Sequence, residues 1–156
     1  NSVLKSGDAV VMDIGGGQDG YSSDITRMAI AGDKPEGYDE IHEIVEAAVQ
    51  AAMKIARPGV KAHKVDDAAR GIISDAGYGE YFVHRTGHGM GVEIHEPPYI
   101  TSSSQSVLEA GMVFSIEPGI YLPGRFGIRL EDIVILRPEG PEILSTLSRE
   151  ARLISG

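Results

Sequence analysis

The sequence predicts an α+β domain built on an antiparallel sheet. Short apolar runs occur in pairs near both ends of the chain, and each pair is separated by a glycine-containing turn signal. Two segments with helical spacing of apolar residues lie between these pairs. Because strands and helices are grouped rather than alternating, the expected order is ββααβββ, and the 156 residues have the length of one domain.

The first unit is predicted to be a hairpin of residues 10–14 and 25–31. Three glycines at 15–17 and the pair Asp19-Gly20 provide the turn signals between these strands. A helix is predicted from about Pro35, where proline suits a first turn, to the breaker Arg-Pro-Gly at 57–59. Its inward face has helical spacing and comprises Tyr38, Ile41, Ile44, Val45, Ala48, Ala52 and Ile55.

The remaining elements follow from the same signals. A second helix is predicted over residues 62–75, and Gly77 ends it. The pattern becomes strand-like and glycine-rich from 79 to 93. A second hairpin is predicted from residues 112–116 and 128–136, joined by a loop that contains Pro123-Gly124.

Composition excludes several classes of function. The net charge of −9 argues against a nucleic-acid partner, which needs a basic face. No run approaches the ~20 apolar residues of a membrane span, so no membrane partner is expected. The chain has no cysteine, which excludes thiolate metal sites and fits the reducing cytoplasm, where we expect the protein to act.

Four carboxylates are predicted to oppose one another in pairs. Opposed residues of a hairpin have numbers with a constant sum, so Asp13 faces Asp24 if the first turn centres between residues 18 and 19. Moving that centre by one residue makes the two carboxylates diagonal neighbours, still within reach of one metal ion. Glu117 faces Glu131 if the second turn centres on residue 124. Because opposed buried like charges must protonate or meet a cation, two such pairs predict two divalent metals.

Three of the five histidines, His84, His88 and His95, fall within twelve residues. The glycines among them make a helix unfavourable and the HExxH motif is absent, so we expect backbone brought close to a ligand instead. Carboxylates with one imidazole suit manganese, cobalt, zinc or iron better than calcium or magnesium. Such a metal pair predicts hydrolysis of an amide or ester. A glycine pattern at 15–20 fits GxGxxG, but a strand follows it where a nucleotide site needs a helix.

Five blocks, taken together and in order, resemble the pita-bread metallopeptidases of family M24. These blocks are residues 13–15, 20–27, 84–97, 115–121 and 128–132, and the resemblance covers essentially the whole chain. The family includes Xaa-Pro aminopeptidases, prolidases and methionine aminopeptidases. The resemblance implies a curved antiparallel sheet backed by helices and a catalytic domain over residues 1–156 that lacks its N-terminal portion.

The resemblance also implies roles for individual residues. Asp13 would chelate one metal, His88 and Glu117 the other, and Asp24 and Glu131 would bridge the two. Glu117 would also take part in catalysis, as would the two substrate-contacting histidines, His84 and His95. Arg129 matches an arginine beside the substrate in the proline-specific branch of the family. The alternative role for Arg129 is a structural salt bridge to a neighbouring carboxylate.

The motif His-Arg-Thr-Gly-His-Gly at 84–89 and the short spacing between Glu117 and Glu131 resemble those of prolidases and Xaa-Pro aminopeptidases. The expected function is therefore metal-dependent cleavage before proline in the second position of a peptide, with Mn²⁺ or Co²⁺ and with Zn²⁺ or Fe²⁺ as further options. A methionine aminopeptidase and a catalytically silent pita-bread binding module are the alternatives. As a C-terminal fragment, the chain is expected to have little activity alone and to form a homodimer through its bared sheet.

Overall fold

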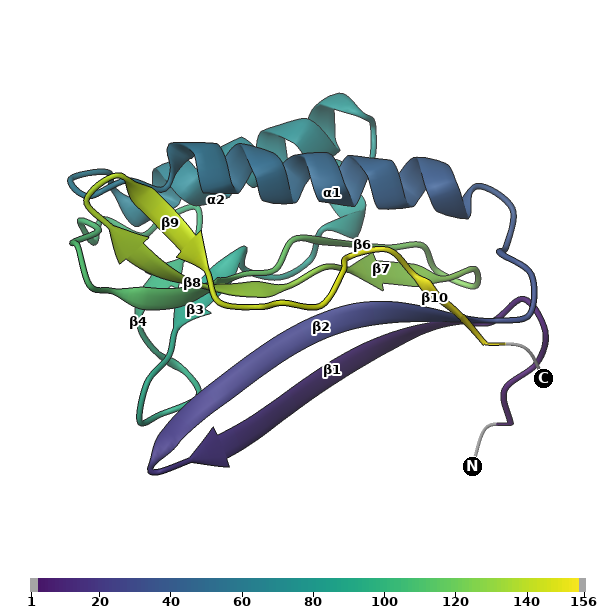
Figure 1. The fold of residues 1–156 in the computed structure, drawn as a ribbon. Coiled ribbons are helices and arrows are strands. Elements are labelled where there is room, and N and C mark those ends of the chain that lie inside the picture. Colours follow the sequence, from purple (N-terminus) through teal and green to yellow (C-terminus); the bar gives the residue numbers. More distant parts are fainter. Residues whose placement is uncertain (1–2, 155–156) are drawn as a thin grey trace.

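Two helices lie side by side against one face of curved strands in the computed structural model, which describes residues 3–154 (Figure 1). In chain order the elements are β1 (Ala9–Gln18), β2 (Tyr21–Ala31), α1 (Tyr38–Ile55), α2 (Ala62–Asp75), the 3₁₀ helix η1 (Gly79–Tyr81), β3 (Gly87–Gly89), β4 (Glu96–Ile100), β5 (Val113–Ile116), β6 (Gly119–Tyr121), β7 (Gly127–Arg129), β8 (Asp132–Arg137), β9 (Gly140–Ile143) and β10 (Arg152–Ile154). No helix among the described residues is long and apolar enough to cross a membrane.

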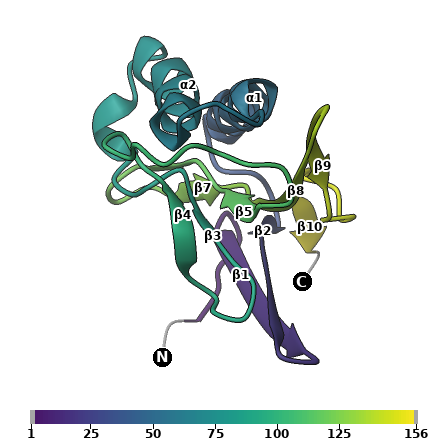
Figure 2. The ribbon, with the colours of Figure 1, turned by 90° about the vertical axis from the view of Figure 1, so that its left-hand side faces the viewer.

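The strands form three connected sheets beneath the helices. One has the order β1-β2-β10, a second the order β4-β3-β5-β8-β9, and β6 pairs with β7. A single antiparallel bridge between Thr26 and Glu131 joins the first hairpin to the second. Viewed end-on, the β1–β2 hairpin extends away from the helices (Figure 2). The α+β prediction is confirmed, but the expected ββααβββ order lacked β4, β6, β9 and β10, and the strand expected over 128–136 is divided into β7 and β8.

Helix α1 begins at Tyr38 rather than at Pro35. Gly37 stands between them with φ 78°, a left-handed conformation that an α-helix cannot contain. Most of the predicted apolar face is buried, and Val45, Ala48 and Ala52 have no exposed surface, but Ile55 at the end of the helix is 38% exposed and was wrongly predicted to point inward. Helix α2 has the predicted bounds. Helix α1 packs on β5 and β7, which contribute Phe114, Ile116 and Ile128 to the core, and α2 packs on α1 and β4.

The first hairpin has a register different from the one expected for directly opposed carboxylates. Asp19 and Gly20 both have positive φ, 53° and 85°, so they form the two-residue turn themselves and Gln18 pairs with Tyr21. Asp13 consequently faces Thr26, and Asp24 faces Gly15. The two carboxylates are therefore diagonal neighbours, which is the alternative that a shift of the turn centre by one residue predicts.

The second hairpin has the expected register. Ile116 pairs with Asp132 in one ladder and Gly119 with Arg129 in the next. The register continues unchanged across the gap between these ladders. Glu117 and Glu131 thus occupy opposed positions within the gap, as predicted.

The glycine-rich stretch contains only the three-residue strand β3, flanked by η1 and bends. Its glycines permit close contact between strands. A Cβ at Gly87 would lie 1.9 Å from the carbonyl oxygen of Ser115, and one at Gly89 would lie 2.3 Å from that of Pro97. The predicted close approach of backbone to a ligand is, in this structure, an approach to neighbouring backbone.

Candidate metal centre

One cleft of about 460 Å³ is lined by all eight residues singled out in the sequence. The eight come from five separate segments and are Asp13, Asp24, His84, His88, His95, Glu117, Arg129 and Glu131. A ninth lining residue, Arg85, was not predicted. A larger groove of about 750 Å³ lies beyond Asp24, shares only that residue with the cleft and has a mainly apolar lining. The titratable side chains therefore identify the smaller cleft as the candidate site.

Asp24, His88 and Glu131 form the innermost group. Each offers one ligand atom, and these atoms all lie within 4.8 Å of one another. Glu131 and His88 are each only 2% exposed. Thr26 donates its hydroxyl hydrogen to Oε2 of Glu131 over 2.6 Å, whereas the buried Oε1 has no hydrogen-bonding partner among the described residues. A buried carboxylate oxygen without a partner is costly unless a cation or a proton meets it.

His88 and Glu117 face one another across the cleft. Nδ1 of His88 lies 3.1 Å from the carbonyl oxygen of Gly89, and because a carbonyl can only accept, this nitrogen carries the hydrogen. Burial lowers the pKa of His88, which favours the neutral ring with a lone pair on Nε2. That Nε2 lies 3.3 Å from Oε1 of Glu117, so two acceptors face each other. A cation between them would satisfy both atoms.

Burial also disfavours charge on three carboxylates of the cleft, Asp24, Glu117 and Glu131. It is the largest cause of the raised pKa of Asp24, to which Asp13 adds repulsion. The pKa of Glu117 is likewise raised by burial. Burial and the neighbouring charge of Glu117 raise the pKa of Glu131 to about 8. The cleft concentrates negative charge that only a proton or a cation relieves.

Arg129 occupies the outer edge of the cleft and contacts Asp13. Its Nη2 donates to Oδ2 of Asp13 over 2.5 Å, and its Nε donates to the Thr26 hydroxyl over 3.1 Å. Nη1 donates to the hydroxyl oxygen of Tyr121 over 3.2 Å. The salt-bridge alternative for Arg129 is thus present, and the same guanidinium links the first hairpin to the second.

A hydrogen bond at each ring nitrogen fixes the orientation of the His84 side chain. Nδ1 lies 2.7 Å from the carbonyl oxygen of Arg85 and therefore donates. Nε2 then accepts from the hydroxyl of Tyr121, 2.8 Å away. Burial lowers the pKa of His84, in keeping with this neutral tautomer. His95 differs, because it is exposed and packs its ring edge-on against His88 with centroids 4.3 Å apart.

Comparison with known proteins identifies the family. Residues 1–138 match the model of metallopeptidase family M24. The chain belongs to family M24. The resemblance on which the sequence analysis relied is thereby confirmed.

Relatives of this M24 chain include enzymes named for proline-containing substrates. It is 44% identical to an Xaa-Pro dipeptidase of Lactobacillus delbrueckii subsp. lactis over 98% of its own length and 42% of that protein. It superimposes on the X-Pro aminopeptidase of Thermotoga maritima with a TM-score of 0.94 and 44% identity, covering 97% of this chain and 43% of the other. The prolidase of Thermococcus sibiricus gives 0.93 and 46%, with coverage of 97% and 41%. The fold is the pita-bread fold of these prolidases, and the chain spans about two fifths of their length.

Divalent metal ions, which family M24 implies, fit the donor set of this chain. A cation would satisfy Oε1 of Glu131, which has no partner within residues 3–154, and the lone pair of His88 that faces Glu117. Oxygen and imidazole donors without thiolate match a hard or borderline divalent ion. The residues present therefore suit the family's cofactor.

Sequence reasoning missed Thr26, Tyr121 and Arg85. Thr26 lies opposite Asp13 in the hairpin, so the correct register would have placed it beside that predicted ligand. Tyr121 lies at the end of β6 in a block that resembles the family, but no charge marked it. Arg85 has no distinguishing spacing, and only the fold brings it to the cleft.

Proposed function

We propose that this chain carries the dinuclear metal site of a peptidase that cleaves the bond between an N-terminal residue and a proline. The buried carboxylate of Glu131 is the observation that carries the proposal. It lies within 4.8 Å of ligand atoms of Asp24 and His88, in a chain of family M24, and one of its oxygens has no partner among the described residues.

The five ligands divide between two metal ions in this proposal. Asp24 and Glu131 bridge, Asp13 completes one site, and His88 and Glu117 complete the other. The site of His88 and Glu117 is supported by the short distance between these two side chains, and by the ligand atoms of Asp24 and Glu131 within 4.8 Å of a ring nitrogen of His88. The diagonal placement of Asp13 and Asp24 supports the first. We propose that both native ions are Mn²⁺ or both are Co²⁺, with Zn²⁺ or Fe²⁺ as alternatives.

Bound metal ions supply a Lewis acid for the scissile carbonyl and a nucleophilic water at neutral pH. The chain's own residues bind, orient and move protons. Tyr121 and the Arg85 carbonyl hold His84 in one tautomer beside the substrate. His95, exposed at the cleft, donates to the reacting carbonyl oxygen. Glu117, whose pKa burial raises, accepts a proton and returns it to the leaving nitrogen.

Specificity for proline in the second position is supported by the names of the relatives, Xaa-Pro dipeptidase, X-Pro aminopeptidase and prolidase. Arg129 lies at the outer edge of the cleft, where it would contact the substrate carboxylate or carbonyl. The absence of cysteine supports action in the reducing cytoplasm.

The test is a peptidase assay on the purified full-length protein with Xaa-Pro dipeptides, longer Xaa-Pro peptides and Met-initiated peptides, each with and without Mn²⁺ or Co²⁺. We expect metal-dependent cleavage of Xaa-Pro bonds. Preferential cleavage of Met-initiated peptides would instead identify a methionine aminopeptidase. Metal binding without cleavage of any peptide would identify a silent binding module. The complete set of five candidate ligands argues against the last, because unused buried carboxylates only destabilise.

A homodimer is part of the proposal. Within residues 3–154, β1 pairs with β2 alone and so presents a free edge, next to the exposed apolar side chains Ile14 and Tyr21. We expect sedimentation velocity to give twice the 16.6 kDa of the chain. A single species of monomer mass at micromolar concentration would contradict it.

A further inference from the structure

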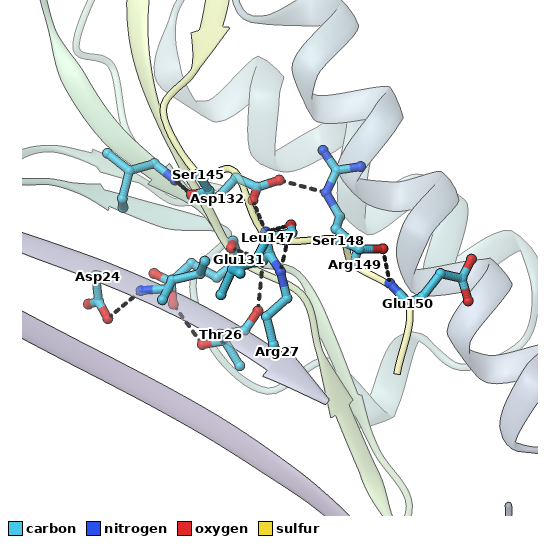
Figure 3. A network of polar contacts seen from close by, with 12 residues as sticks. Asp24, Thr26, Arg27, Glu131, Asp132, Ser145, Leu147, Ser148, Arg149 and Glu150 are labelled. Carbon is cyan, nitrogen blue, oxygen red and sulfur yellow. Dashed lines mark hydrogen bonds and ion pairs between the residues drawn. The ribbon is translucent and has the colours of Figure 1, made fainter. Parts of the chain in front are cut away.

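The guanidinium of Arg27 uses all of its donors inside the protein (Figure 3). Nη1 donates to the carbonyl oxygens of Thr26, over 2.9 Å, and of Glu131, over 2.5 Å. Nη2 donates to Oδ1 of Asp132 over 2.6 Å and, like Nε, to the carbonyl oxygen of Leu147. An arginine has five N–H donors in a fixed fork, so this environment matches its shape completely.

These contacts fix the main chain of Glu131 on both sides. Its N–H donates to the carbonyl oxygen of Thr26 over 3.2 Å, and its own carbonyl accepts from Arg27. The carboxylate then receives the Thr26 hydroxyl on the opposite face of the strand. Backbone and side chain of Glu131 are therefore held from opposite faces, and Oε1 remains directed into the buried group.

The fixation extends through a chain of ion pairs to helix α1. Asp132 is 1% exposed and receives Arg27 on Oδ1 and Arg149 on Oδ2, the latter over 2.6 Å. Arg149 also donates to Glu46 of α1 over 2.6 Å. The charges balance, two positive against two negative, and the Arg27–Asp132 link is shielded from solvent. An ion pair this deeply buried costs desolvation, so a contribution to stability does not by itself account for it.

We propose that Arg27, held by Asp132 and Arg149, is a positioning residue that sets the carboxylate of Glu131 for metal binding. This inference rests on the proposed metal site. It makes the C-terminal segment 147–149 a structural part of that site, because the Leu147 carbonyl and Arg149 anchor the two members of the buried pair. Lysine cannot replace Arg27, because a single ammonium group cannot reach all four acceptors of the planar guanidinium. These acceptors are one Asp132 carboxylate oxygen and the carbonyl oxygens of Thr26, Glu131 and Leu147.

The test is calorimetric titration of Mn²⁺ into the metal-free 156-residue chain, with the visible absorption of the Co²⁺ form as a report on ligand geometry. The variants are Arg27→Lys, Asp132→Asn and the double variant Arg27→Met/Asp132→Leu. The last removes both buried charges together, so we expect it to fold. Arg137→Met is the matched control, because it removes an exposed arginine of β8 from its ion pair with Glu142 of β9. Circular dichroism confirms that each metal-free variant folds.

We expect the three Arg27 and Asp132 variants to bind Mn²⁺ roughly 10–100-fold more weakly and to alter the Co²⁺ spectrum, as loss of outer partners does elsewhere. Arg137→Met should bind as the wild type does. Wild-type affinity and spectrum in the folded double variant would overturn the inference. An unfolded double variant would also overturn it, by showing that the pair holds the whole fold. A wild-type chain that binds no Mn²⁺ would instead overturn the proposed function, and the inference with it.

Discussion

The hydroxyl of Thr26 donates to one oxygen of the Glu131 carboxylate over 2.6 Å and leaves the other oxygen buried without a partner among residues 3–154. The carboxylate is thereby immobilised on one side and available on the other. Such an arrangement suits a metal ligand, because the ordering of the side chain precedes binding.

Metal-free protein should lose stability as pH rises through the neutral range. The pKa of Glu131 is about 8 in the folded chain against an ordinary 4.5, because of burial first and the charge of Glu117 second. Between these values the folded state holds a proton that the unfolded state has released, so folding weakens as pH rises from about 4.5 and the loss is complete above about 8. Urea unfolding in chelator at pH 5, 6.5 and 8.5 measures this.

Glu131→Gln is the control, because it cannot ionise and should flatten this dependence. Metal binding at pH 6.5 should release protons, seen as buffer-dependent heats of Mn²⁺ binding, and release less at pH 9. A metal-free protein whose stability rises steadily from pH 5 to 8 would contradict the assignment.

Thr26→Val should weaken metal binding roughly 10–100-fold, because the isosteric change removes the donor that orients Glu131. Thr26→Ser keeps the hydroxyl and should bind nearly as the wild type does. Calorimetry on the two variants makes the comparison. Equal affinity in both would show that the hydroxyl has no part in positioning the carboxylate.

Asp24→Ala and Glu131→Ala should each lose both metal ions rather than one, since both residues bridge in the proposed site. Metal content after dialysis, by atomic emission, is the measurement. Asp13→Ala serves as the comparison and should retain the ion held by His88 and Glu117. Full activity in either bridging variant would refute the bridging assignment.

His84→Ala and His95→Ala should lower turnover by roughly 10²–10⁴-fold while metal content stays close to two ions. The reason is that His84 is committed to Tyr121 and the Arg85 carbonyl, and His95 is exposed at the rim. Steady-state kinetics and metal analysis of the same samples are compared. Parallel loss of metal would reassign these histidines as ligands.

Gly87→Ala should destabilise the protein by roughly 1–3 kcal/mol or more, because its Cβ would lie 1.9 Å from the carbonyl oxygen of Ser115. The strand that carries His88 would have to move. Gly71→Ala is the control, since no atom lies within 4 Å of the added Cβ on helix α2, and it should stabilise by about 0.5–1 kcal/mol. Urea unfolding of the two variants decides, and similar shifts in both would contradict the close-contact argument.

The sequence predicted the helices well, because local spacing determines them. Turn spacing also predicted the paired carboxylates, whereas the family resemblance, not spacing, placed the histidines and Arg129 beside them. Helix α2 has the expected bounds, and the register that opposes Glu117 to Glu131 follows from one turn. The first hairpin was displaced because the Asp19-Gly20 pair is itself the two-residue turn, and its left-handed conformation fixes the register more firmly than the glycines before it.

Long-range partners could not be predicted in the same way. Arg27 contacts Asp132 and Leu147 because β2 and the C-terminal segment meet in space, and neither spacing nor charge pattern in one strand indicates this. Tyr121 likewise acquires its partners only when the second hairpin and the loop before β3 are folded together. β10 is too short for its parallel pairing with β2 to leave a periodic signal.

The contact between Arg27 and the Leu147 carbonyl joins residues 120 positions apart, and β10 then pairs with β2. A chain emerging from a ribosome therefore presents its first hairpin long before the residues that fix it exist. Glu131 is added 107 residues after Asp24, so until then a nascent chain carries Asp13 and Asp24 on an unfinished sheet edge. Folding dominated by such distant pairs is slow, and the nascent hairpin stays exposed to aggregation throughout that delay.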